Sequence, residues 1–301
     1  MSDCLRACED EARREGLRGV RIRLRLSDTP AVAPLVDLPW EYLYDPEQDR
    51  FLSHYMETPL VRYLESSAGL LPPLRVPPPL RVLVMTSSPP GHARLDVETE
   101  WRQLQGAVAD LVRDGVLEVE RVPSPTLPAL VDTLQRGTYH VFQFMGHGRF
   151  DEATNESVLV LEDAFGRPAA VKAPKLAVAL HDHRSLRLVV LNACEGARTS
   201  SRDVYAGIAQ SLARRNLPAV IAMQAELTDQ AALTFSHAFY QSLAAGQPVD
   251  AALAQARKLL YLGGNDVEWG APVLYMRSRD GEIIDPTAPR VAKPASRAKA
   301  P

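Results

Sequence analysis

Apolar and polar positions follow two different patterns along the chain, and the change falls near residue 80. Before it, residues 19–26 alternate apolar side chains with arginine, the period-two pattern of a strand that has one solvent-facing side. After it, short apolar runs alternate with longer segments in which apolar residues recur every three or four positions. Residues 67–80 hold five prolines, which favour an extended linker between the two parts.

The part after residue 80 predicts strands and helices in alternation. The expected strands cover residues 81–87, 116–122, 140–145, 158–162, 186–191, 218–224 and 271–276. The expected helices cover residues 95–115, 126–137, 174–181, 203–216, 229–245 and 249–263, and a further short helix is expected at residues 1–16. Apolar strands that alternate with helices are typical of a mostly parallel sheet covered on both faces, so we expect an α/β fold.

The composition is that of an ordinary globular protein, with 46% apolar and 24% charged residues in a chain of 301. A net charge of −3 argues against a direct nucleic-acid partner, which needs a basic surface. No apolar run approaches the roughly 18 residues of a membrane span, and the N-terminus lacks the apolar core of a secretory signal. Three cysteines make no disulfide framework, so we expect a cytoplasmic protein with usable thiols.

Two apolar runs end at residues that can carry chemistry. The run 188–193 ends at Cys194, and the run 139–146 ends at His147. Because the reactive edge of a parallel sheet is at the carboxyl ends of its strands, the thiol and the imidazole can lie side by side if the two strands are neighbours. A thiolate is a strong nucleophile, and an imidazole can take its proton.

Glycines flank the histidine. Gly146 and Gly148 are expected to let the chain turn sharply at His147 and to leave backbone open to a substrate. The backbone N–H groups of Gly148 and Cys194 are candidate oxyanion donors. Asn192 is expected on the same side of its strand as Cys194, where it either braces the site or makes an ordinary strand-end hydrogen bond.

From the residues alone, a catalytic pair and a buried structural cysteine both stay open, because free cysteines are usually buried and inert. Other site chemistries find no support in the chain. There is no Gly-x-Ser-x-Gly motif of a serine hydrolase, no Cys-x-x-Cys or His-x-x-x-His pattern of a zinc site, and no nucleotide-binding glycine fingerprint. We therefore expect neither a metal nor a cofactor.

At these residues the chain resembles CHAT domains, the bacterial branch of caspase-like cysteine peptidases that includes relatives of separase. The matching stretches are collinear: LPWEYLYDP (38–46), TPLVR (58–62), HVFQFMGHG (140–148), VLNACE (190–195), PAVIAMQ (218–224) and WGAPVL (269–274). The resemblance implies a caspase-like three-layer α/β sandwich, with a mostly parallel central sheet and helices on both faces. It also implies that His147 is the general base and Cys194 the nucleophile of a thioester-forming endopeptidase.

The resemblance further implies that the leading residues belong to the same module as the rest. We therefore expect a single domain over residues 1–285, made of a leading strand unit (18–66), the proline-rich linker (67–80) and an α/β core (81–280). The residues from 286 to 301 are rich in proline, alanine and lysine, and are expected to form a disordered tail.

Caspase-like peptidases select substrates mainly by the side chain before the cut bond, and a basic side chain there needs a carboxylate. Segment 224–229 looks similar to the separase segment that serves arginine recognition, so Glu226 and Asp229 are the first candidates. Glu162 and Asp163 are the second candidates. An alternative for Asp229 is that it or the preceding threonine caps the next helix.

Three further residues have structural and functional interpretations. Trp269 either walls the substrate pocket or packs in the core. Glu41 and Arg62, both inside family-like stretches, are expected to pair with each other as a structural bridge. The polar segment 150–157 after His147 is either a mobile lid or an ordinary surface loop.

We therefore expect a cysteine endopeptidase that acts on protein substrates. The resemblance suggests a regulated effector in bacterial defence or signalling, served by a separate sensor or regulatory subunit. The alternative is a non-catalytic interaction or scaffold module of the same fold.

Overall fold

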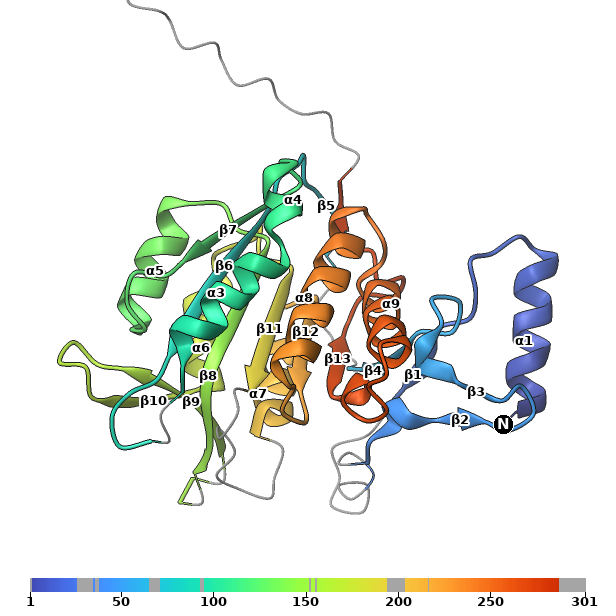
Figure 1. Ribbon diagram of the computed structural model, residues 1–301, viewed down its shortest axis with the longest axis horizontal. Helices are drawn as coiled ribbons and strands as arrows, with labels where there is room; N and C mark the ends of the chain where they lie inside the picture. The colour runs from blue at the N-terminus through green and yellow to red at the C-terminus, as the bar shows by residue number, and fades with distance from the viewer. Residues whose placement is uncertain are drawn as a thin grey trace, which may run out of the picture.

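A computed structural model gives the fold of the chain and describes most of its 301 residues. The described residues are 2–25, 35, 38–64, 71–92, 95–151, 153–154, 156–193, 204–215 and 217–286. Cys194 and the expected tail beyond residue 286 lie outside them. Strands and helices alternate through the described part of the chain and build three layers (Figure 1).

A ten-stranded sheet forms the middle layer. Its main path runs β1-β4-β13-β12-β11-β8-β6-β7, and β9 and β10 continue from β8. The strands of the path are β1 (Ile22–Leu24), β4 (Leu60–Tyr63), β13 (Pro272–Met276), β12 (Ala219–Met223), β11 (Leu188–Ala193), β8 (Val141–Asp151), β6 (Leu80–Ser87) and β7 (Leu117–Arg121). Neighbours on this path are parallel except β12 and β13.

Burial explains the difference between central and edge strands. In β12 all five residues are buried, and in β11 the apolar run Leu188–Leu191 is at most 2% exposed. A strand covered on both faces needs apolar side chains at every position. At the edge of the sheet, β7 instead alternates apolar and charged residues, because one of its faces is exposed to solvent.

Helices cover both faces of the sheet. One face carries α3 (Val97–Ala107), α8 (Asp229–Ala244) and α9 (Val249–Leu262), and the other carries α5 (Leu127–Arg136), α6 (Ala173–His181) and α7 (Val204–Arg214) (Figure 1). The expected three-layer α/β sandwich with a mostly parallel sheet is thereby confirmed. None of the helices in the described residues is both long and apolar enough to cross a membrane.

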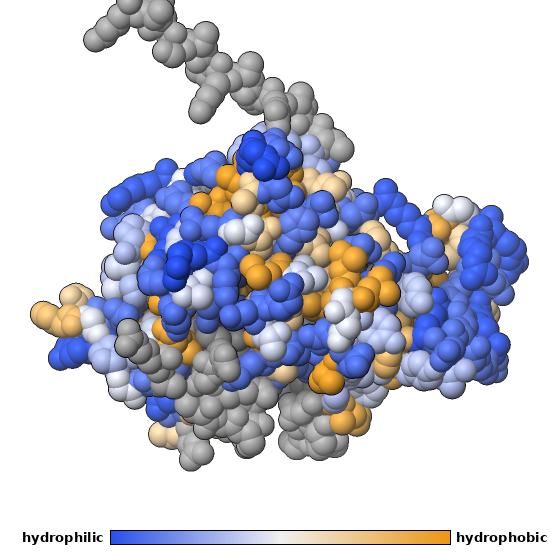
Figure 2. Space-filling model, in the orientation of Figure 1, coloured by the Kyte–Doolittle hydropathy of each residue, from blue (hydrophilic) through white to orange (hydrophobic). Residues whose placement is uncertain are grey.

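The leading residues complete the sheet of the core. Strands β1 and β4 extend it beyond β13. Within the expected linker, β5 (Leu74–Arg75) pairs with β14 (Ile284–Asp285) near the end of the described chain. Helix α1 (Ser2–Arg14) lies at the far side, next to the hairpin of β2 (Tyr44–Asp45) and β3 (Arg50–Phe51), in a hydrophilic region of the surface (Figures 1 and 2).

Three elements differ from the sequence prediction. The expected helix 95–115 is two helices, α3 and α4 (Ala109–Arg113), because the chain breaks at the fully buried Val108, two residues after a glycine that weakens the helix. Strand β8 runs on to Asp151 and forms a hairpin with β9 (Glu156–Glu162), so both ends of the expected loop 150–157 are strand. Strand β10 (Pro168–Lys172) was not predicted, since it is short and begins with a proline and two alanines, residues that are depleted in strands.

Candidate active site

Strand β8 changes partners between Gly146 and His147. Up to Gly146 it lies between β6 and β11, with Gly146 opposite Ser87 on one side and Ala193 on the other. From His147 to Asp151 it pairs with β9 instead, and His147 lies opposite Val160. His147 is therefore the first residue beyond the carboxyl edge of the main sheet, and it is 1% exposed.

Gly146 has no room for a side chain. A Cβ built there would lie 2.7 Å from the main-chain oxygen of Ser87 and 2.8 Å from the Phe144 ring. Gly146 and Gly148 both lie inside β8, so the expected sharp turn at His147 was wrong. The close approach of two main chains, and not a turn, explains the glycine at position 146.

Two buried hydroxyl groups hold the chain on either side of His147. The Ser87 hydroxyl donates to the main-chain oxygen of Val160 at 2.9 Å, and Val160 is the register partner of His147. The Tyr205 hydroxyl donates to the main-chain oxygen of Gly146 at 2.6 Å. The peptide unit before the candidate base is thus bonded from α7, and the residue opposite the base is bonded from β6.

A second imidazole lies against His147. The ring of His92 has its centroid 5.2 Å from that of His147, with 38° between the ring planes. His92 follows Gly91, whose φ of +84° turns the chain after β6. Sequence reasoning missed His92, Ser87 and Tyr205. The end of β6 at the same sheet edge was a usable signal for the first two, whereas Tyr205 had none.

Cys194, the expected nucleophile and oxyanion donor, lies outside the described residues. Its preceding neighbour, Ala193, ends β11 and lies opposite Gly146 in register. Asn192 lies opposite Met145, and its side-chain oxygen is buried without a hydrogen bond from any described residue. Gly148, the other expected oxyanion donor, lies opposite Leu159 of β9.

The first pair of candidate pocket acids follows β12. Glu226 is half-buried in the connection to α8, and Asp229 is the exposed first residue of that helix. The helix cap is Thr228, whose hydroxyl accepts from the N–H of Ala231 at 3.4 Å. Asp229 thus favours the helix through its charge near the N-terminus, and its carboxylate is not needed as a cap.

The second pair of acids lies on the opposite side of β8. Glu162 ends β9, where its N–H donates to the oxygen of Pro125 at 2.8 Å, and burial raises the pKa of its carboxyl group. Asp163 accepts hydrogen bonds from the N–H groups of Phe165 and Arg167, and it pairs with the Arg167 guanidinium at 2.7 Å. The hydrogen bonds from Arg167 lower the pKa of Asp163, which therefore stabilises the β9–β10 turn as an anion. This turn carries Phe165, whose side chain is 81% exposed.

Trp269 lies in an aromatic cluster and is 0% exposed. Its ring centroid lies 4.6 Å from that of Tyr42, 4.8 Å from that of Phe51 and 4.1 Å from that of His54. Burial, with a smaller effect of nearby Arg257 and Lys258, lowers the pKa of His54 to about 4. These contacts are those of a core residue.

The expected pair of Glu41 and Arg62 is confirmed, with 2.9 Å between the guanidinium and the carboxylate and both side chains buried. Gln224, directly after β12, donates to the same carboxylate at 3.3 Å. Burial lowers the pKa of neighbouring Arg257 to about 10, and the Glu41 charge opposes that shift. The pair therefore anchors the leading residues beneath the end of β12.

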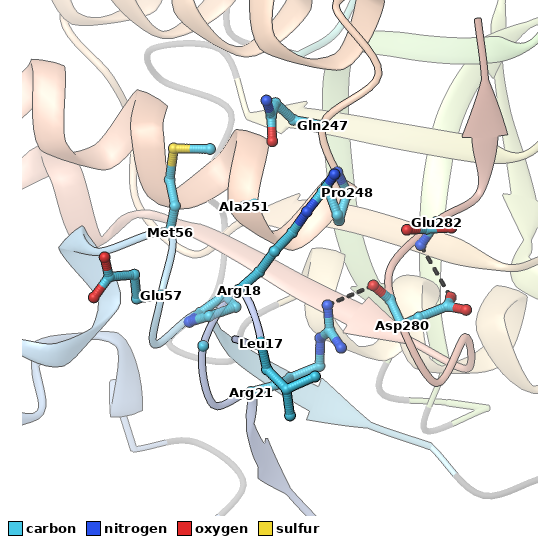
Figure 3. Close-up of a pocket in the computed structure, with 12 residues that line it drawn as sticks. Leu17, Arg18, Arg21, Met56, Glu57, Gln247, Pro248, Ala251, Asp280 and Glu282 are labelled. Carbon is cyan, nitrogen blue, oxygen red and sulfur yellow. Dashed lines mark hydrogen bonds between the residues drawn. The ribbon is translucent and has the colours of Figure 1, made fainter. Parts of the chain in front are cut away.

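A cavity of about 450 Å³ lies at a different place, where the leading residues meet the start of α9 (Figure 3). Arg18, Glu57 and Glu282 carry charge at its rim. Arg21 crosses it to bond the main-chain oxygen of Asp280 and the buried Asp250. Neither His147 nor any candidate pocket acid lines this cavity.

Comparison with known families identifies the chain. The model of the CHAT domain matches residues 9–284, nearly the whole of the described chain. The chain belongs to the CHAT domain family. No curated protein sequence matches this CHAT domain closely enough to count as a relative.

Solved structures show what the fold of this CHAT domain is similar to. The Arg-specific cysteine proteinase gingipain R (RgpB) has a TM-score of 0.50 at 12% identity, over 93% of this chain and 67% of the other. The separase of the Saccharomyces cerevisiae separase–securin complex has a TM-score of 0.42 at 16% identity, over 80% of this chain. The Drosophila initiator caspase Dronc has a TM-score of 0.40 at 13% identity, over 68% of this chain and 81% of the other. The CHAT domain spans only 14% of the separase chain. The likeness to gingipain R shows a shared fold.

Proposed function

We propose that this CHAT domain is a cysteine endopeptidase that cleaves protein substrates with Cys194 as nucleophile and His147 as general base. One observation carries the proposal: Gly146 and Ala193 are register partners in neighbouring parallel strands, and His147 and Cys194 are the next residues of their chains. Since consecutive Cα atoms are about 3.8 Å apart, neither of the two functional residues can lie far from this register pair.

The proposed reaction has two halves. His147 takes the proton of the Cys194 thiol, and the sulfur forms a bond to the carbonyl carbon of the scissile peptide. The N–H groups of Gly148 and Cys194 are the proposed donors to the oxyanion. The C–N bond then breaks, and His147 gives its proton to the leaving amine. Water, activated by His147, hydrolyses the thioester and restores the thiol.

The decisive test is peptide-library cleavage by the purified chain. The unaltered chain is expected to cut peptides, while Cys194→Ala and His147→Ala each abolish cleavage and keep the far-ultraviolet circular dichroism and melting temperature of the fold. Cys8→Ala removes an exposed free thiol on α1 and is the matched control. Cleavage that survives Cys194→Ala would contradict the proposal, and a folded chain that never cuts would favour the scaffold alternative.

We propose a basic side chain before the cut bond, recognised by an acid beside the site. Glu226 is favoured because it follows the strand next to β11, whereas Asp163 already serves the β9–β10 turn. Loss of a charge-assisted hydrogen bond of about 1.5–3 kcal/mol predicts that Glu226→Gln lowers kcat/KM for an arginine peptide roughly ten- to hundredfold. Asp229→Asn and Glu162→Gln test the remaining candidates. Glu282→Gln, at the remote cavity, is the control.

We also propose that the peptidase is a regulated effector in bacterial defence or signalling, controlled by a separate sensor or regulatory subunit. The resemblance to CHAT domains supports this role, since such domains usually act beside sensor modules. The expected result is weak cleavage by the isolated chain and strong cleavage with a partner co-purified from its own cells. Full activity of the isolated chain would contradict the regulated role and leave the peptidase proposal intact.

A further inference from the structure

Tyr205 makes a long-range contact with the backbone next to His147. It lies in the first turn of α7 and is 3% exposed. Its hydroxyl donates to the main-chain oxygen of Gly146 across 59 positions of sequence, at a distance of 2.6 Å. A hydroxyl of this kind adds nothing to apolar packing, so its position points to the hydrogen bond itself.

The accepting oxygen belongs to the peptide unit that begins His147. A peptide unit is planar, so fixing the Gly146 oxygen also fixes the N–H of His147 and limits the φ angle of that residue. The φ angle in turn sets where the Cα–Cβ bond points and hence where the imidazole lies. This peptide unit is where β8 leaves β6 and β11 for β9, so the regular ladder of the main sheet ends here.

Helix α7 is packed closely enough to hold this contact. A Cβ at Gly207 would lie 2.8 Å from the hydroxyl oxygen of Ser157, so α7 rests directly on β9. On β6, the Ser87 hydroxyl donates a hydrogen bond to the main-chain oxygen of Val160, the β9 residue that lies opposite His147. The peptide unit before His147 is thereby bonded from α7, while the strand opposite His147 is bonded from β6.

We propose that Tyr205 is a positioning residue for His147, which acts through the Gly146 carbonyl and touches neither the substrate nor the reacting atoms. The inference rests on the proposed peptidase function. Because α7 begins soon after Cys194 in sequence, the same hydroxyl ties the orientation of the base to the chain that follows the nucleophile.

The test is Tyr205→Phe, which keeps the ring and removes the hydroxyl. Slight misorientation of a base slows the chemical step more than binding, so kcat is expected to fall roughly tenfold while KM stays within about twofold. The backbone ¹⁵N resonance of His147 is expected to move, because the carbonyl of its own peptide unit loses a hydrogen bond. This second readout needs no catalytic activity.

Tyr240→Phe is the matched control. Tyr240 is also buried, and its hydroxyl bonds the same strand, but through the side chain of Gln143, away from His147. This variant is expected to lose stability without changing kcat or the His147 resonance. If Cys194→Ala is inactive but Tyr205→Phe has an unchanged kcat, the positioning role is overturned and the peptidase proposal stands. An unmoved His147 resonance in Tyr205→Phe overturns the positioning role in the same way. Cleavage by Cys194→Ala overturns the peptidase proposal instead.

Discussion

Ala193 and Gly146 face each other as register partners in strands β11 and β8. The next residue after each is one of the two on which the proposed chemistry depends, Cys194 and His147. Since both strands run in the same direction, Ala193 and Gly146 lie at the same edge of the main sheet. The relationship of these two small residues therefore underlies the proposed active site.

Gly146→Ala is expected to disturb this edge. Its Cβ would lie 2.7 Å from the main-chain oxygen of Ser87, and main chain in a buried sheet has little freedom to move. Overpacking of this kind costs about 1–3 kcal/mol, and we expect that loss in chemical denaturation together with a large drop in cleavage. Gly106→Ala in α3 meets nothing within 4 Å and is expected to be neutral or stabilising. Unchanged stability and activity in Gly146→Ala would show that the close approach is unimportant.

Glu41→Gln is expected to destabilise the fold. Removing one partner of a buried ion pair typically costs about 3–5 kcal/mol, and here the Arg62 and Arg257 guanidinium groups both lose a nearby negative charge. The free energy of unfolding measures this loss. Asp10→Asn in the exposed pair with Arg13 is the control and should change the same quantity by less than about 0.5 kcal/mol. Equal effects of the two variants would argue against an anchoring role for Glu41.

Stability is expected to fall on mild acidification through His140. Burial, with a smaller effect of the Arg81 charge, lowers the pKa of His140 from 6.5 to about 4 in the folded chain. Between these values the unfolded chain binds the extra proton, so this contribution is fully present above about pH 6.5 and is lost as the pH falls toward 4. It amounts to about 2 kcal/mol between pH 7 and pH 5.

Denaturation curves at pH 7 and pH 5 check this prediction. The loss of unfolding free energy at the lower pH should shrink in His140→Gln and persist in His183→Gln, whose ring is half-exposed. His54, whose pKa burial also lowers to about 4, acts with the same sign, so some dependence is expected to remain. The same pH dependence in His140→Gln as in the unaltered chain would contradict the assignment.

Most of the sheet could be predicted from the sequence because its strands are buried on both faces. Strand β12 is apolar at every position, and β11 is apolar from Leu188 to Leu191. Short apolar runs of this length, bounded by helical patterns, predict buried strands. The continuation of β8 past His147 could not be predicted, because its last residues are polar and pair only with β9. Strand β10 was missed because its proline and two alanines do not favour a strand.

The candidate site could be predicted only where a residue directly follows an apolar run in the sequence. His147 was found in this way. Tyr205 was not, because its role depends on a hydroxyl that reaches a backbone oxygen 59 positions away, and no local pattern encodes such a contact. The ring of Trp269 illustrates the converse: its sequence neighbours left pocket and core open, and only its 0% exposure places it in the core.

The proposed peptidase function depends most on the nucleophile, and substrate-dependent labelling of Cys194 tests it most directly. A peptidyl electrophile with a basic residue next to its reactive group is incubated with the unaltered chain, Cys194→Ala and His147→Ala, and the labelled residue is found by mass spectrometry. The exposed Cys4 and Cys8 report peptide-independent background. We expect labelling at Cys194 that depends on the peptide and is lost in both variants. Labelling of Cys194 that is equally fast without the peptide, or unchanged in His147→Ala, would contradict it.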